Sequence, residues 1–439
     1  MNGIRGLQSR FLRLAVPNIL SNLMVPLASA IDVALLGHLA DVRDLAGVAL
    51  ATVLFDVFLW GFGFLRMATT GLTAQARGRR DPDAERTIAL RAVAIAVTAG
   101  VAILVLQWPL REAGFLALQG TAELEVAARA YFDARIWGAP FVLLNYAWLG
   151  WLLGRERSGQ ALVMSMVGHG TNIVLDVAFI AGLGWGAAGA GAATALSQVA
   201  MTAVALRLVA PALPWSAVRR VLPRLRDRRA LGGFFSLGRD ITIRTLLLVG
   251  VFAVFTNIAA AMGTVTLAAT AVLRQVVMLA AWFVDGFAFA VESLVGVFAG
   301  ENDREALHRT LRVAMAWGVG TSTIVAVACV LFPRALLGLL VDHVDVMDRM
   351  VEIVLWLVPV LVFSAPAYVY DGFFLGLTAG ATLRRAMIVS TLGGFVPLAA
   401  VAVTTGDVHW LWAALSTFML ARTWTLGRQV AGHLRTVDR

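Results

Sequence analysis

Four oxygen-bearing side chains lie within long apolar runs of this sequence. They are Asp32, Asn172, Asp176 and Thr194, and Asp176 shares a helical face with Asn172 because it follows four residues later. Placing a charged side chain inside a membrane costs about 2.5–3.5 kcal/mol on insertion scales, so each acid needs a compensating role. Two carboxylates, an amide and a hydroxyl together would offer an oxygen-rich site for a cation or a proton.

The apolar runs have the length of membrane-spanning helices, which need about 20 residues. The 439-residue chain is 59% hydrophobic and only 14% charged, whereas soluble domains average about 25% charged residues. We therefore predict an all-α integral membrane protein with about twelve transmembrane helices. The predicted spans lie near 11–36, 45–74, 87–108, 128–153, 160–184, 187–206, 241–262, 265–299, 311–332, 348–377, 386–405 and 408–427.

The basic residues of this chain are unevenly distributed between the connections of the predicted spans. All 36 of them are arginines, and most lie in alternate connections between the predicted spans, whereas the other connections are acidic or uncharged. By the positive-inside rule, the arginine-rich connections and both termini face the cytoplasm. The net charge of +9 is therefore a topology signal, and we expect no nucleic-acid partner.

Two residue types that are missing or rare limit the chemistry of this chain. Without lysine, the chain cannot by itself build a P-loop ATPase or a Schiff-base enzyme. The single cysteine, Cys329, allows no internal disulfide and no cysteine-ligated metal site. We expect no catalytic residues, no metal site and no cofactor, and hence a protein that is not an enzyme.

The predicted topology places three of the polar residues at a common depth. At a rise of 1.5 Å per residue, Asp32, Asp176 and Thr194 lie roughly 6–12 Å below the outer surface. Burial favours the protonated form of a carboxyl group, and a second carboxylate nearby favours it further. Such a pair could take up a proton at one membrane face and release it at the other. The alternative is a structural role, such as a hydrogen bond from Asp32 to a helix end.

Short patterns recur between the two halves of the chain at a nearly constant spacing. They indicate a duplication with six helices per half, so that both halves enter the membrane in the same direction, as in parallel-repeat transporters. We predict an N-terminal lobe at 1–210, a cytoplasmic linker at 211–240 and a C-terminal lobe at 241–439, pseudo-symmetric around a central cavity. The recurring patterns are Trp137-x-x-Pro140 with Trp356-x-x-Pro359, Leu152-Leu153-Gly154 with Phe374-Leu375-Gly376, and Gly78 and Asp81 with Gly300 and Asp303.

The C-terminal half carries its own ionisable residues within predicted spans. Its acids either contact a cationic substrate or pair with Arg244 or Arg274, and the sequence leaves both interpretations open. A few of the methionines could line an adaptable cavity. The residues that we predict for a substrate cavity are Asp371, Tyr370, Glu292, Arg274 and Met67.

Four segments resemble the DinF-like branch of the MATE (multidrug and toxic compound extrusion) transporters. Segments 31–39 and 64–76 are similar to the ends of the first and second helices of that branch. Segments 172–177 and 189–195 are similar to its fifth and sixth helices. The resemblance implies two six-helix lobes that form a V, and cation-driven export of diverse, often cationic compounds.

The resemblance also implies roles for individual residues. It assigns the coupling ion to a polar cluster in the N-terminal lobe and a helix bend to a proline in the first span, which here is Pro17. The seventh span carries Arg244 where the related NorM-like branch has a glutamate, although Asp371 matches an aspartate of that branch. This departure favours coupling in the N-terminal lobe, to protons, with sodium as the alternative ion. The cluster carried over by the resemblance consists of Asp32, Asn172, Asp176, Thr194 and Asn145.

The expected function is secondary active multidrug efflux, in which drugs and organic cations leave in exchange for protons or sodium. The expected location is the bacterial plasma (inner) membrane, as a multi-pass monomer embedded in the lipid bilayer. The main alternative is a flippase for a lipid or lipid-linked precursor, which should present a cluster of basic residues to phosphates. A prenyl-type transferase would need two acidic metal-binding motifs, and only Asp41 and Asp44 resemble one.

Overall fold

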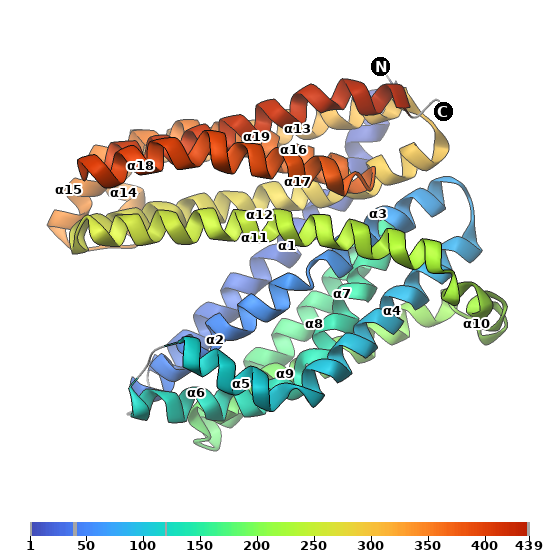
Figure 1. The fold of residues 1–439 in the computed structure, drawn as a ribbon, viewed down its shortest axis with the longest axis horizontal. Helices are drawn as coiled ribbons and strands as arrows, with labels where there is room; N and C mark the ends of the chain where they lie inside the picture. Colours follow the sequence, from blue (N-terminus) through green and yellow to red (C-terminus); the bar gives the residue numbers. More distant parts are fainter. Residues whose placement is uncertain (1, 38–41, 119–120, 437–439) are drawn as a thin grey trace. The chain divides into compact units, whose positions relative to one another are not determined.

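The computed structural model describes residues 2–37, 42–118 and 121–436, and within these ranges the chain is helical throughout, without strands (Figure 1). The first half of the chain forms α1 (Asn2–Gly37), α2 (Val42–Gly61), α3 (Phe64–Gly78), α4 (Pro82–Val105), α5 (Gln107–Ala117), α6 (Ala122–Arg135), α7 (Ala139–Gly154), α8 (Ser158–Asp176), α9 (Gly186–Val209) and α10 (Trp215–Val221). The second half forms α11 (Arg228–Ala261), α12 (Thr264–Glu301), α13 (Arg304–Leu331), α14 (Pro333–Leu337), α15 (Val344–Ile353), α16 (Leu357–Gly376), α17 (Gly380–Val389), α18 (Val396–Thr405) and α19 (Val408–Thr436).

Short helical segments of other types link or extend several of these helices. Two of them, η2 (Val177–Gly182) and η6 (Ser390–Phe395), are π-helical turns that continue α8 and α17. The others are 3₁₀ turns: η1 (Ile136–Gly138), η3 (Ala210–Ala212), η4 (Leu222–Arg226) and η5 (Val354–Trp356).

The length and apolarity of these helices confirm a multi-pass membrane protein. Among the described residues, eleven helical stretches are long and apolar enough to cross a membrane, against about twelve predicted. The remaining predicted span, 408–427, lies in α19, which is long enough at 29 residues. It falls short in apolarity because it carries His409, Arg422 and several serines and threonines.

Packing divides the chain into two compact units. The N-terminal unit is Leu20–Phe235, and the C-terminal unit is Met1–Ile19 together with Ser236–Arg439. The boundary therefore falls inside α1, two residues after Pro17. The stacked rings of Phe11 and Phe287, 5.9 Å apart, hold the start of α1 against α12 within the C-terminal unit. These units differ in extent from the predicted lobes, which remain a prediction about membrane topology.

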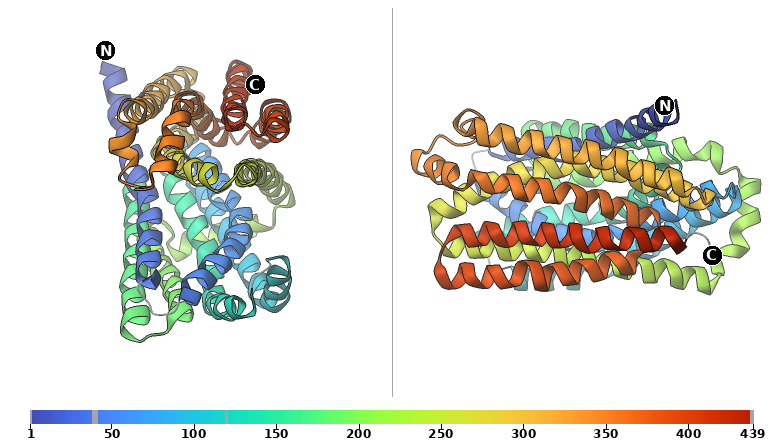
Figure 2. Two further views of the ribbon diagram at one scale, coloured as in Figure 1. Left: turned by 90° about the vertical axis from the view of Figure 1, so that its left-hand side faces the viewer. Right: turned by 90° about the horizontal axis from the view of Figure 1, so that it is seen from above.

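Each unit is a bundle with its own apolar core. In the N-terminal unit, α7 packs against α3, α4 and α9, and α8 packs against α9 (Figure 1). Trp148, Trp151 and Met201 contribute to the core there. In the C-terminal unit, α12, α13, α16 and α19 run along one another (Figure 2), and the core includes Phe255 and Trp412.

The duplication predicted from the sequence recurs in the packing of helices. Gly154 on α7 lies so close to α3 that a Cβ atom would be 2.6 Å from the carbonyl oxygen of Thr70. At Gly376 on α16, a Cβ atom would likewise be 2.6 Å from the carbonyl oxygen of Glu292 on α12. Gly154 and Gly376 are 222 residues apart in the sequence, and so are Thr70 and Glu292. The same glycine-mediated contact is therefore built once in each half of the chain.

The helix starts follow the same repeat. Asp81 caps α4 by accepting a hydrogen bond from the amide of Ala84 at 2.9 Å, and Asp303 caps α13 through Ala306 at the same distance. The residue before each cap, Arg80 or Asn302, has a left-handed backbone with φ of 56° or 58°. An aspartate N-cap satisfies an otherwise unpaired backbone amide, which explains why the motif persists in both halves.

Candidate functional site

The two aspartates singled out by the sequence meet inside the N-terminal unit. Asp32 lies on the second part of α1, and Asp176 is the last residue of α8 before the π-helical turn η2. Their carboxyl groups lie within hydrogen-bonding range of each other. Asp176 is fully buried, and no N–H or O–H donor among the described residues serves either of its oxygens. The structure thus pairs a fully buried carboxyl group with a half-buried one.

A second contact between α1 and α8 explains why the aspartates meet. The Ser21 hydroxyl donates a hydrogen bond to the Ser165 hydroxyl, with 2.5 Å between the oxygens. Asp32 and Asp176 each lie eleven residues further along their helices, which is close to three full turns at 3.6 residues per turn. Two helices that run in the same direction and touch at the serines therefore bring the same faces together again at the aspartates.

Asn172 lies beside this pair, as its spacing predicted. It is one helical turn before Asp176 on α8, it is only 7% exposed, and its amide nitrogen finds no acceptor among the described residues. Leaving a buried amide without a hydrogen-bond partner costs about 1–3 kcal/mol. Such a group therefore needs an explanation, and a bound ion or water molecule would provide one. The π-helical turn that follows Asp176 is also a feature often found at functional sites.

Thr194 and Asn145 have other partners. The Thr194 hydroxyl donates to the carbonyl of Ala190 on its own helix at 2.9 Å. The Asn145 amide donates to the Gln198 side-chain oxygen at 3.0 Å and accepts from the Thr202 hydroxyl at 2.9 Å. The described hydrogen bonds therefore tie Asn145 to α9 and do not join it to the carboxyl pair.

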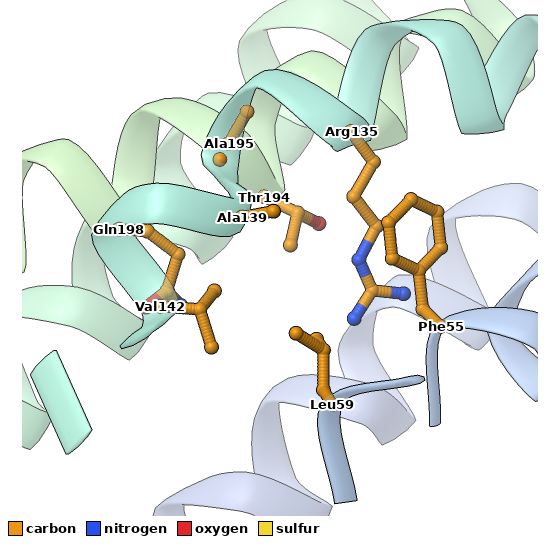
Figure 3. A pocket seen from close by; sticks show the side chains of 9 residues that line it. Phe55, Leu59, Arg135, Ala139, Val142, Thr194, Ala195 and Gln198 are labelled. Atoms are coloured by element: carbon orange, nitrogen blue, oxygen red, sulfur yellow. The ribbon is translucent and has the colours of Figure 1, made fainter. Parts of the chain in front are cut away.

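Thr194 lines a small pocket of about 10 Å³, with room for one water molecule (Figure 3). The Arg135 guanidinium lies over the ring of Phe55, 4.4 Å from its centroid, and donates to the Tyr131 hydroxyl at 2.8 Å. The Thr194 side chain points toward Arg135 in this pocket. The positive charge of Arg135 interacts electrostatically with Asp32.

The C-terminal unit holds a buried ion cluster of its own. Asp371 on α16 binds Arg244 on α11 and, at 2.6 Å, Arg422 on α19. The Arg422 side chain is 1% exposed and its guanidinium lies 5.3 Å from the centroid of the Tyr368 ring. Of the two interpretations left open for Asp371, the structure supports pairing with arginine.

The remaining predicted cavity residues lie on α12, α16 and α3. Glu292 is fully buried in α12, where its backbone packs against Gly376, and Arg274 is half-buried on the same helix. Tyr370 is half-buried with its hydroxyl near Gly427, and Met67 is half-buried on α3 in the N-terminal unit. Their contribution to substrate binding remains a prediction.

Two residues of these sites, Arg422 and Gln198, were not predicted from the sequence. Arg422 lies in an apolar run and meets the same criterion that selected the other charged residues, so the signal was present. Gln198 carried no such signal, because an uncharged amide in a transmembrane helix is unremarkable until its contact with Asn145 is seen.

Comparison with known proteins identifies the family. The family model MatE matches residues 17–178 and again 241–401, so that each half of the chain matches separately. The chain belongs to the MatE family. It is therefore a transporter of the MATE multidrug efflux family and not an enzyme, and the double match agrees with the internal duplication.

Individual relatives cover most of the chain. It is 31% identical to "DNA damage-inducible protein F" of Escherichia coli (strain K12) over 96% of this chain and 92% of that protein. It is 27% identical to "Probable multidrug resistance protein NorM" of Rhizobium meliloti (strain 1021), over 75% of this chain and 72% of that protein. The first of these relatives agrees with the DinF resemblance that the motifs indicated.

Solved structures show the same MATE fold. A transporter of the MOP superfamily from Pyrococcus furiosus superposes with a TM-score of 0.89 at 21% identity, covering 100% of this chain and 99% of that one. The outward-facing conformation of a multidrug resistance MATE family transporter superposes with a TM-score of 0.88 at 21% identity, covering 98% and 97%.

Proposed function

We propose that this MATE transporter exports organic cations in exchange for protons that bind the Asp32–Asp176 pair. The observation that carries the proposal is the meeting of two carboxyl groups with no other hydrogen-bond donor for Asp176. Ionised carboxylates only accept hydrogen bonds, so the two groups can bind each other only when one of them holds a proton. A carboxyl pair in this state is a proton carrier.

The proton and the substrate would compete through charge. With one proton on the pair, the site has one negative charge fewer and attracts a cationic drug less strongly. When the proton leaves, the site regains that charge and attracts the cationic drug again. A monovalent cation exchanged for one proton moves no net charge across the membrane, so the exchange draws on the pH gradient, which supplies about 1.4 kcal/mol, or roughly tenfold accumulation, per pH unit without an ATP site.

Sodium is the alternative coupling ion. The carboxylates of Asp32 and Asp176 and the side-chain oxygen of Asn172 are oxygen ligands of the kind that alkali and other hard cations prefer. The proton is favoured because Asp176 is fully buried and because the positive charge of Arg135, which acts on Asp32, opposes a second fixed cation. The two ions are distinguished by the gradient that drives transport.

The test uses the full-length protein in liposomes with an acidic interior. Addition of ethidium should stimulate proton efflux in the wild type, with or without sodium, and Asp32→Asn should abolish this efflux. The matched control is Asp56→Asn, which makes the same substitution at another aspartate of the N-terminal unit and should retain coupling.

Three outcomes would alter the proposal. Dye movement that requires a sodium gradient would retain the family and change the ion. Equal loss in Asp56→Asn would show that coupling does not depend on the Asp32–Asp176 pair. Failure of several dyes, with no effect of Asp32→Asn, would contradict drug antiport and make lipid flipping the next assay.

The arginines of the C-terminal unit give the flippase alternative little support. A flippase needs basic groups available to lipid phosphates, whereas Arg244 and Arg422 both bind Asp371. We further propose that the protein acts as a monomer in the inner membrane. Both termini would lie in the cytoplasm, because the arginine-rich connections are then on the cytoplasmic side.

A further inference from the structure

The connection between α9 and α11 is rich in arginine. The coupling mechanism proposed for Asp32 and Asp176 gives these arginines no role. The connection runs from 213 to 227, between the candidate spans Gly186–Ala212 and Arg228–Ala261. It contains α10 and the short turn η4. The arginines in and directly after it are Arg219, Arg220, Arg224, Arg226, Arg228 and Arg229.

This segment is an ordered part of the N-terminal unit. Ala217 and Val221 on one face of α10 are buried, and α10 packs against α4. Arg86 on α4 donates to the carbonyl of Ala212 at 3.2 Å, and Arg91 donates to the carbonyl of Arg224. Its backbone is therefore fixed at both ends by side chains of α4.

The opposite face presents positive charge and apolar groups together. Trp215 is 74% exposed and Leu222 is 43% exposed. The arginines at 219, 220, 224 and 226 are all exposed, and within the described part of the chain only Arg220 has an ion pair, at 3.9 Å from Asp83. The single acid of the segment, Asp227, instead caps α11 by accepting from the amide of Arg229 at 2.9 Å.

We infer that this face, Trp215 to Arg226, binds the headgroups of anionic phospholipids. Clusters of four to eight basic residues next to a transmembrane helix attract anionic lipids, and exposed tryptophan is enriched at the headgroup level of membranes. Arginine matches phosphate particularly well because its planar guanidinium donates two hydrogen bonds at once. The surface is the cytoplasmic leaflet on the topology proposed above.

The test titrates the full-length protein in detergent with acyl-labelled phosphatidylglycerol and follows fluorescence anisotropy. The test variant is Arg219→Gln/Arg224→Gln/Arg226→Gln. If each arginine contacts a phosphate, its loss should weaken binding roughly fivefold, so the triple variant should bind about a hundredfold more weakly. Binding of labelled phosphatidylcholine should be unchanged, and the same positions changed to lysine should retain most of the binding of phosphatidylglycerol.

The matched control is Arg13→Gln/Arg312→Gln/Arg385→Gln, which changes the net charge equally at exposed arginines of the C-terminal unit. It should bind phosphatidylglycerol like the wild type. Equal loss in this control would show that net charge alone attracts the lipid, and wild-type binding by the test variant would also overturn the inference. Loss of heparin binding in the test variant, with phosphatidylglycerol binding intact, would overturn it in favour of a soluble anionic partner.

Discussion

Gly376→Ala is a sharp test of the close contact between α16 and α12. The added Cβ atom would lie 2.6 Å from the carbonyl oxygen of Glu292, 3.0 Å from the amide nitrogen of Gly296 and 3.0 Å from the Cβ atom of Val295. Ordinary contacts of this kind begin near 3.4 Å, and two of the three atoms belong to the backbone. No side-chain rotation relieves the overlap, so the two helices must separate by several tenths of an ångström.

The expected loss of stability follows from two opposing effects. Overpacking of a core costs about 1–3 kcal/mol, whereas replacing glycine by alanine within a helix favours folding by about 1 kcal/mol. The net loss is then about 0–2 kcal/mol, and the 2.6 Å approach to a backbone oxygen places this site near the upper value. For a unit of roughly 200 residues, each kcal/mol lowers the melting temperature by about 2–4 °C, so we expect a decrease of about 5 °C.

Cys329 provides the assay. It is the single cysteine of the chain, it lies on α13 in the same unit, and it is 6% exposed. A maleimide dye that fluoresces on reaction with a thiol therefore reports unfolding of the C-terminal unit during a temperature ramp. The matched control is Gly320→Ala on α13, where no atom lies within 4 Å of the added Cβ atom. The reasoning fails if Gly376→Ala melts with the wild type, or if Gly320→Ala loses as much stability.

Three further predictions concern charged and capping residues. Asp371→Asn removes the carboxylate that Arg422 binds and should cost about 3–5 kcal/mol, seen as a large decrease in melting temperature in the same thiol assay. Asp81→Ala removes the cap of α4 and should cost about 1 kcal/mol, with faster amide exchange in its first turn and no change elsewhere. Hydrogen bonds from Arg129 lower the pKa of Glu112 on α5 to about 2, so their stabilisation is present above its ordinary pKa of 4.5 and is lost as the pH falls toward 2. Amide exchange of α5, corrected for intrinsic rates, should rise across that window in the wild type and stay level in Glu112→Gln.

The sequence was sufficient for the spans and for the duplication. Hydrophobic run length is a local property, and the membrane requires every spanning segment to satisfy its own backbone hydrogen bonds, so the predicted spans all became helices. Asp81 recurs as Asp303 because an aspartate cap depends on a few neighbouring residues of the same helix. Such a feature can be predicted without knowing the partner helix.

Partners across helices were predicted less completely. Asp32 and Asp176 were expected at one depth, and in the structure their carboxyl groups lie within hydrogen-bonding range of each other. Asn145 was assigned to the same cluster, yet its hydrogen bonds go to Gln198 on α9. Depth along the membrane normal can be counted from the sequence, whereas rotation of a helix about its axis decides which neighbour a side chain contacts.

The sequence by itself determined that this is a polytopic, internally duplicated membrane protein with acids in its spans, because composition, run length and spacing are properties of the chain. Only the tertiary structure decided how those charges are compensated. It paired Asp32 on α1 with Asp176 on α8, two helices that also touch at Ser21 and Ser165. It also placed Asp371 between Arg244 and Arg422, which lie on two helices far apart in the sequence. The physical reason is that compensation acts over a few ångströms, and only folding brings residues from different helices to that distance.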